Sequence, residues 1–512
     1  SGLNATFFDA EKCMVSDREY MDYIRQYLTN DRVLGIMNTL KVEDFYVEER
    51  VKEMRRKIEE TDGICVVYGV GASIVHAGDI LVYADLARWE IQLRFAAGAP
   101  NWKAHNENAP KLAKFKQGFF VEWRMADRLK KKLFDRIDFL LDTNRKGEPK
   151  MVCGDGFRAG LETFCREPFR LVPYFAPEVW GGQWMKEICG LDPDAPNYAW
   201  AFDGVPEENS IFMQFGEVRV EVPSVDVVFY RPAQLLGSRV HARFGDEYPI
   251  RFDFLDTMGG QNLSLQVHPL TEYIQSAFGM HYTQDESYYI LDCGEDSVVY
   301  LGLKEGVDSG AMLDELKQAQ GGEIVFDADK YVNKWKAKRH DHFLIPGGTV
   351  HCSGKDTMVL EVSATPYIFT FKLWDWGRVG LDGLPRPVHI GHGEKNIQWD
   401  RTTGWVKENL LNRIEPLCDT PAVTVERTGL HEREFVETRR YTIRESAVLK
   451  SEGGVSSCNV VEGEGAVIES VDGSFAPYEV HYAETFILPA QVKECVIRPI
   501  SGEVKILRAT VR

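Results

Sequence analysis

The sequence predicts a multi-domain protein in which an α/β region precedes an all-β region. In residues 1–166, short apolar runs alternate with segments of helical spacing, which is typical of an α/β layer. Beyond residue 168, short β-runs are separated by Gly, Pro and Asp turns, and many short strands with such turns indicate sandwiches or barrels. The junction is the segment 168–184, PFRLVPYFAPEVWGGQW, which has three prolines and a Gly pair.

Composition excludes several classes of function. The 512 residues carry a net charge of −18, whereas a nucleic-acid partner needs a basic surface. No apolar run approaches the roughly 18–20 residues that span a bilayer, and the first residues lack the pattern of a secretory signal, so no membrane association is expected. None of the ten cysteines forms a CxxC pair, and we expect reduced thiols in a cytoplasmic protein.

The N-terminal region contains strand candidates at 64–69, 79–86 and 137–143, between segments of helical spacing. YGVGAS (68–73) follows the first strand as a phosphate-binding turn would, but it lacks the Lys of a Walker A loop. Together with the segments that follow, it resembles a P-loop nucleoside kinase that has lost its catalytic loop. The resemblance implies a degenerate kinase-like domain over 1–166. Nucleotide binding and a scaffold role, including homo-oligomerisation, both remain open.

The all-β region divides into two similar units, which suggests an internal duplication. The first unit is expected over 168–392 and the second over 418–512. Between them, the polar, Trp-containing stretch 393–417 has helical character, and we expect a helical connector there.

A cluster of possible metal ligands lies in the first of these units. In NLSLQVHP (262–269), side chains two residues apart on a strand share a face, so Gln266 and His268 point to one side. Glu286 begins the next β-run and His351 follows a Pro-Gly-Gly turn. Two imidazoles, a carboxylate and an amide oxygen suit Zn²⁺ or another divalent first-row metal. The alternative is a set of hydrogen-bonded interior groups.

A family resemblance favours the metal. WGG (180–182), YPIRFDFLDT (248–257), LSLQVHP (263–269), TQDESYY (283–289), IPGGTVHCSG (345–354) and WDWGR (374–378) occur in order along the chain. In these motifs, residues 173–512 resemble the type I phosphomannose isomerases, two-cupin enzymes that interconvert mannose 6-phosphate and fructose 6-phosphate. The resemblance implies two jelly-roll domains and a sugar-phosphate substrate. It also implies a metal site made of Gln266, His268, Glu286 and His351.

The sequence departs from the family at three charged positions. Gln284 and Asp253 stand where the family has lysines, and Lys372 stands where it has an active-site arginine. Because Arg to Lys loses the bidentate fork, phosphate recognition would change unless neighbouring cations compensate; the candidates are Arg251, Lys355 and Arg378.

Two functions follow from these residues. The first is a metal-dependent aldose–ketose isomerase acting on mannose 6-phosphate, with Lys372, Gln284 and Arg378 as the candidate catalytic residues and Lys372 stabilising charge. The second is a non-catalytic or differently specific metal-containing cupin that binds a sugar or sugar phosphate.

Overall fold

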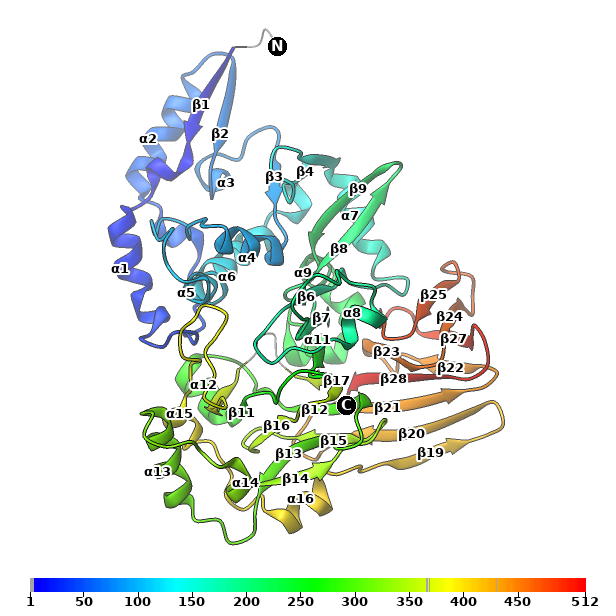
Figure 1. The fold of residues 1–512 in the computed structure, drawn as a ribbon. Helices are drawn as coiled ribbons and strands as arrows, with labels where there is room; N and C mark the ends of the chain where they lie inside the picture. Colours follow the sequence, from blue (N-terminus) through cyan, green and yellow to red (C-terminus); the bar gives the residue numbers. More distant parts are fainter. Residues whose placement is uncertain (1–3, 365–366, 368, 430) are drawn as a thin grey trace. The chain divides into compact units, whose positions relative to one another are not determined.

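The computed structural model describes residues 4–364, 367, 369–429 and 431–512. The chain forms two compact units. Unit 1 comprises Ser1–Gly160, Met213–Val222 and Ala277–Met280, and unit 2 comprises Leu161–Phe212, Pro223–Ser276 and His281–Arg512. Figure 1 shows helices among the blue and cyan elements and many strands among the green to red ones. The structure is therefore a mixed α/β protein that is rich in β-sheet.

Unit 1 contains two small sheets and several helices. Helix α1 begins with a capping box, in which Ser16 and Glu19 exchange hydrogen bonds with each other's backbone N–H groups. The helices are α1 (Asp17–Leu28), α2 (Glu48–Glu59), α3 (Ala72–Val75), α4 (Arg88–Ala96), α5 (Lys111–Gln117), α6 (Trp123–Lys131) and α7 (Gly154–Thr163). The strands are β1 (Ala5–Asp9), β2 (Ile64–Tyr68), β3 (Val82–Asp85), β4 (Phe139–Asp142) and β5 (Lys150–Cys153).

The predicted strands of unit 1 form, but they do not share one sheet. β2 pairs in parallel with β1, whereas β3 pairs with β4, and β4 with β5. In the turn after β2, the Val70 N–H donates to the Glu11 carboxylate, and Asp9 also approaches this turn at Gly69. A phosphate-binding turn would leave such N–H groups free for an anion. The kinase-like fold is therefore not confirmed.

The first half of unit 2 is a pair of antiparallel sheets. The six-stranded sheet has the order β15-β12-β17-β10-β7-β6, and the five-stranded sheet has the order β14-β13-β16-β11-β18. Their strands are β6 (Tyr174–Ala176), β7 (Trp200–Gly204), β10 (Arg251–Asp256), β11 (Leu265–Val267), β12 (Glu286–Cys293), β13 (Val298–Leu303), β14 (Val332–Lys336), β15 (His342–Ile345), β16 (His351–Ser353), β17 (Thr357–Ser363) and β18 (Phe371–Trp374).

Helices and one hairpin accompany this pair of sheets. The hairpin is formed by β8 (Ser210–Phe215) and β9 (Val218–Pro223), and its tip belongs to unit 1. The helices are α8 (Trp184–Ile188), α9 (Val225–Tyr230), α10 (Pro232–Leu236), α11 (Ser238–Phe244), α12 (Thr271–Phe278), α13 (Ser309–Gln320) and α14 (Ala328–Tyr331). Where a helical connector was expected over 393–417, the structure has one short helix, α16 (Thr403–Asn409); α15 (Ile390–Gly393) ends where the stretch begins, and the stretch ends inside a strand.

The second half of unit 2 repeats the two-sheet plan. Its sheets have the orders β19-β20-β21-β28-β23-β26 and β22-β27-β24-β25, and alternate side chains such as Cys458, Val460, Ile497 and Ile506 fill the core between them. The strands are β19 (Glu415–Asp419), β20 (Val423–Gly429), β21 (Val436–Ile443), β22 (Ala447–Lys450), β23 (Ser456–Glu462), β24 (Gly465–Ser470), β25 (Tyr478–His481), β26 (Thr485–Leu488), β27 (Glu494–Pro499) and β28 (Val504–Val511).

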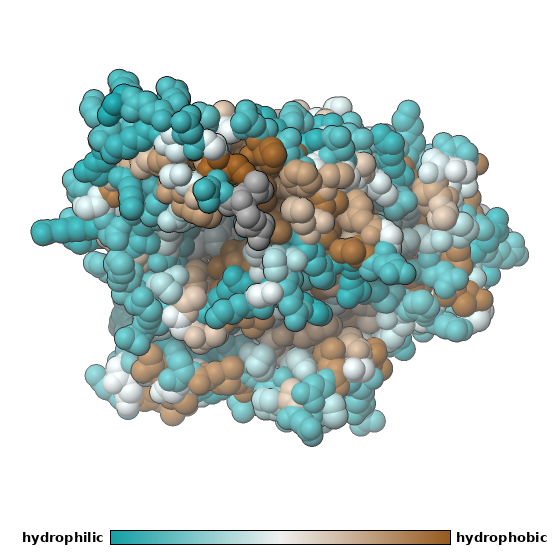
Figure 2. Space-filling model, turned by 90° about the horizontal axis from the view of Figure 1, so that it is seen from above, coloured by the Kyte–Doolittle hydropathy of each residue, from teal (hydrophilic) through white to brown (hydrophobic). Residues whose placement is uncertain are grey.

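The face drawn in Figure 2 is largely hydrophilic, with hydrophobic residues gathered in separate patches. Exposed apolar side chains of this kind are normal on folded proteins. Within the described ranges, no helix is long and apolar enough to cross a membrane.

Candidate metal centre

The four predicted ligands lie between the two sheets of the first half of unit 2. Gln266 is on β11 and faces His351 of β16 in the strand register. His268 is the first residue after β11. The strand ends here because Pro269 lacks an N–H and cannot extend the ladder. Glu286 is the first residue of β12, in the opposite sheet. All four side chains are buried, so the strands place these polar groups inside the molecule.

Three of the four side chains converge on one point. Glu286 Oε2 lies 2.9 Å from His268 Nε2, and Glu286 Oε1 lies 2.8 Å from His351 Nε2. One potential ligand atom from each of the three residues lies within 4.8 Å of the others. Gln266 joins them, because its Nε2 lies 3.2 Å from His351 Nε2. Since the two ends of an amide are assigned from their contacts, a rotation of the amide would direct its oxygen to the same point.

The hydrogen bonds of the two imidazoles fit a cation. His268 Nδ1 lies 3.0 Å from the Phe369 carbonyl, and His351 Nδ1 lies 2.8 Å from the Thr349 carbonyl. A carbonyl only accepts, so each Nδ1 carries a proton, and a ring that is neutral would present its Nε2 lone pair to Glu286. A nitrogen lone pair and the carboxylate oxygen that it faces repel each other at this distance. Either a proton or a metal ion must therefore lie between the Nε2 atoms and Glu286. These residues therefore fit a divalent metal.

The pKa shifts in the cluster also favour positive charge next to Glu286. Burial alone would lower the pKa of His268, but the Glu286 carboxylate outweighs burial and raises it. Burial would raise the pKa of Glu286, but the two histidines lower it far below its ordinary value. Glu286 therefore remains an anion in the interior, where an anion requires a positive partner.

Gln284 is engaged with its protein neighbours. Its amide nitrogen donates to Glu286 Oε2 at 3.0 Å and to Glu361 Oε1 at 3.4 Å, and its oxygen accepts from the Phe369 N–H at 2.7 Å. The side chain is buried. This arrangement holds the carboxylate of Glu286 in place.

The buried arginine that could have compensated is already paired. Arg251 donates to Asp253 through Nε, and its Nη1 lies 3.4 Å from Glu208. Burial raises the pKa of Asp253 to about 6, and the Arg251 charge opposes that rise. Asp253 lies opposite Glu361 on the neighbouring strand. Asp253 is two residues from Arg251 in the same motif, whereas Glu208 is distant in the chain and no motif signals its contact.

Lys372 and Arg378 lie at different kinds of position. Lys372 is opposite Gln266 in the register of β11 and β18, and opposed residues project from the same face of a sheet. Its amine makes no hydrogen bond or ion pair within the described part of the chain; burial and Arg386 lower its pKa to about 8. Arg378 instead pairs with Asp375 and donates to the Asn262 carbonyl.

Lys355, the remaining compensating candidate, is exposed and lies 3.9 Å from Asp356. None of the three candidates therefore supplies a buried, unpaired cation beside the cluster.

Arg401, for which the sequence predicts no role, holds the turn before His351. Its buried guanidinium donates to the Pro346 and Gly347 carbonyls at 2.8 Å each and to Thr349 Oγ1. Thr349 in turn accepts from His351 through its own carbonyl. The arginine lies outside every motif, and its position in a polar stretch gave no signal.

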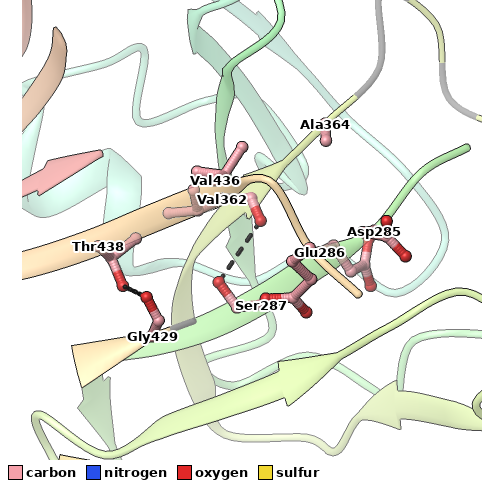
Figure 3. A pocket seen from close by; sticks show the side chains of 9 residues that line it. Asp285, Glu286, Ser287, Val362, Ala364, Gly429, Val436 and Thr438 are labelled. Atoms are coloured by element: carbon pink, nitrogen blue, oxygen red, sulfur yellow. Dashed lines mark hydrogen bonds between the residues drawn. The ribbon is translucent and has the colours of Figure 1, made fainter. Parts of the chain in front are cut away.

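Beside the cluster, a cavity of about 10 Å³ lies between strands of the two halves of unit 2. Its lining includes Asp285, Glu286, Glu434 and Thr438, and in Figure 3 the side chains of Asp285 and Glu286 extend from the start of β12 in different directions. A cavity of this size holds about one water molecule. It is too small for a sugar.

The N-terminal region and the β-rich region match different proteins. Residues 2–166 match the model of a family described as a domain of unknown function (DUF8485). Mannose-6-phosphate isomerase ManA of Bacillus subtilis is 26% identical over 306 residues, which cover 59% of this chain and 88% of the relative. Mannose-6-phosphate isomerase of Streptococcus mutans is 24% identical over 335 residues, which cover 64% and 94%.

Solved structures of mannose 6-phosphate isomerases also align with this chain. The mannose 6-phosphate isomerase of Bacillus subtilis aligns with a TM-score of 0.55 at 19% identity, covering 67% of this chain and 99% of the other. A zinc-bound mannose 6-phosphate isomerase aligns with a TM-score of 0.50 at 15% identity, again covering 67% and 99%. About three fifths or more of this chain is thus homologous, at low identity, to mannose-6-phosphate isomerases and shares their fold.

Proposed function

We propose that the chain is a metal-dependent aldose–ketose isomerase that interconverts mannose 6-phosphate and fructose 6-phosphate. The observation that carries the proposal is the buried cluster of His268, Glu286 and His351, whose ligand atoms converge between the two sheets. The names of the relatives supply the isomerase activity and mannose 6-phosphate as its substrate, and fructose 6-phosphate is the ketose isomer of that sugar. Because a solved protein of this fold contains zinc, Zn²⁺ is the proposed metal.

The metal would be held by the imidazole Nε2 atoms of His268 and His351, by Glu286 and by the amide oxygen of Gln266. When bound, such an ion polarises the oxygens on C1 and C2 of a sugar as a Lewis acid. Gln284 fixes the Glu286 carboxylate through its hydrogen bond. The backbone carbonyls of Phe369 and Thr349 fix the two rings.

The reaction moves hydrogen within one molecule. The proton on C2 is removed and returned to C1, and the hydroxyl hydrogen on O2 is exchanged for one on O1, so no oxidant or reductant is consumed. Negative charge develops on these oxygens during the transfer. Lys372 projects from the same face as Gln266, and in its protonated form the unpaired amine stabilises that charge.

A second candidate function is a metal-containing cupin with another substrate, or with a binding role alone. The charge of the interior favours it: Arg251 is committed to Asp253 and Glu208, and Gln284 is neutral. A hexose 6-phosphate brings close to two negative charges, which require cations within reach.

A coupled assay separates the two candidates. Fructose 6-phosphate formation from mannose 6-phosphate is measured with zinc-reconstituted and chelator-treated protein side by side. Turnover that depends on zinc supports the isomerase. Absence of turnover in protein that demonstrably contains one zinc per chain rejects it and favours the second candidate.

A further inference from the structure

A second cavity in unit 2 has the size of a small-molecule site. It has a volume of about 510 Å³, within the range of roughly 300–1,000 Å³ that is usual for ligand pockets. It lies among the ends of α11, α12 and β12 and the segment before β21. None of the four proposed metal ligands lines it. Its lining includes Arg243, Phe244, Tyr282, Asp285, Arg433 and Phe435.

Two arginines on its wall are available to a ligand. Arg243 and Arg433 are both exposed, and within the described residues neither guanidinium has a hydrogen bond or an ion pair. The guanidinium of Arg243 lies over the rings of Phe244 and Phe435, 5.1 and 4.9 Å from their centroids. Stacking orients the planar group and leaves its N–H edge free.

The acidic side chains of the pocket are already engaged. Glu247 lies 3.2 Å from His281 Nδ1 and raises the pKa of that imidazole. Asp285 accepts from the Gly347 N–H at 2.7 Å. Arg433 also lies near enough to Asp285 to lower the pKa of that carboxyl, but among the described residues the two guanidinium groups keep all their N–H donors for an anion.

Three aromatic rings complete the wall. Phe244 packs edge-on against Tyr282 at 5.3 Å between centroids, and Phe435 lies 4.7 Å from Phe244 and 5.7 Å from Tyr282. An apolar wall beside a pair of cations suits a ligand with one anionic end and a less polar body.

The floor of the pocket adjoins the metal centre. Asp285 precedes Glu286 in the chain, and through Gly347 it contacts the turn that leads to His351. Thr283 donates to the carbonyl of Pro269, the residue after His268. A ligand in this pocket would thus contact segments next to three of the proposed metal ligands.

We propose that this pocket binds a phosphomonoester, with Arg243 and Arg433 as the groups that hold the phosphate. Guanidinium groups match phosphate oxygens two at a time, and two of them balance a dianion. The phosphate can belong to the sugar that reacts or to a separate effector, and the chemistry of recognition is the same. The proposal goes beyond the isomerase function, because binding does not require turnover.

Calorimetry tests the proposal on the zinc-loaded full chain. The probes are mannose 6-phosphate, mannose and inorganic phosphate, and the variants are Arg243→Met, Arg433→Met and the double variant. The double variant is expected to bind mannose 6-phosphate at least fivefold more weakly and to leave the affinity for mannose unchanged. Arg413→Met, an exposed arginine of unit 2 outside the pocket, is the matched control and should bind as wild type does.

A double variant that binds both mannose 6-phosphate and inorganic phosphate within fivefold of wild type overturns the proposal, as does wild-type protein that binds neither phosphate probe. Where turnover is present, a raised KM for mannose 6-phosphate with unchanged kcat in the double variant identifies the phosphate as the substrate's own. If the double variant no longer binds inorganic phosphate but keeps the wild-type KM for mannose 6-phosphate, the phosphate belongs to a separate effector. If the protein shows no turnover, only the proposed isomerase function is rejected, because calorimetry still tests whether the pocket binds a phosphomonoester.

Discussion

Replacing Arg401 with methionine tests whether the turn before His351 sets the affinity for metal. The substitution keeps much of the side-chain volume and removes donors to the Pro346 and Gly347 carbonyls and to Thr349 Oγ1. Pro346 keeps hydrogen bonds from the N–H and hydroxyl of Thr349. The Gly347 carbonyl loses the donor that Arg401 supplies, and leaving one buried acceptor unpaired costs about 1–3 kcal/mol of unfolding free energy.

The expected effect on metal binding is of similar size. Removing a group that orients a metal-binding histidine usually lowers affinity about 10- to 100-fold, which is about 1.4–2.7 kcal/mol. Zinc affinity is measured by competition with a chromophoric chelator, and the unfolding free energy by urea titration of the metal-free protein. Arg413→Met is the control, because it removes an exposed guanidinium that makes no contact with this turn. A stability loss with zinc affinity within twofold of wild type would refute the reasoning.

Three further outcomes are expected. His351→Ala should reduce bound zinc, measured by mass spectrometry, without changing the circular dichroism of the fold; full zinc occupancy would exclude His351 as a ligand. Burial lowers the pKa of Lys372 to about 8, so a role for its protonated amine predicts that kcat/KM falls as pH rises through 8 and the proton is lost. Lys372→Arg should extend the plateau of the pH profile to higher pH, and identical profiles for the two proteins would contradict this role. Asp253→Asn should lower the urea-derived unfolding free energy by about 3 kcal/mol, the low end for a broken buried pair because Glu208 still faces Arg251; a loss under 1 kcal/mol would show that the pair is not needed.

Local patterns predicted the elements better than their partners. The run 64–69 is a strand as expected, but it pairs with β1 and not with β3 or β4, because pairing depends on long-range contacts that a window of sequence does not contain. In the stretch 393–417, Arg401 and Thr402 interrupt the expected helix. Arg401 bonds to a distant turn, and its backbone carbonyl accepts from Leu303.

The candidate site shows the same division. Alternation on a short strand placed Gln266 and His268 on one face, and the structure brings His268 close to Glu286 and His351. Which cations are free could not be predicted, since the partners of Arg251 and Arg378 include groups distant in the chain. Charge availability is a property of three-dimensional pairing.

Unit 1 is built from three separate segments of the chain, so it cannot be completed during synthesis until the last of them has been made. The indole N–H of Trp89 donates to the Glu221 carboxylate at 3.1 Å, and the Asn144 amide donates to the Glu221 carbonyl at 2.9 Å. The Met37 N–H donates to the Phe278 carbonyl at 2.8 Å. A ribosome must therefore add more than a hundred residues beyond residue 160 before these partners exist. A gene fragment that stops near residue 166 would encode a unit with these donors left without their acceptors, and we expect it to be less stable than unit 1 within the full chain.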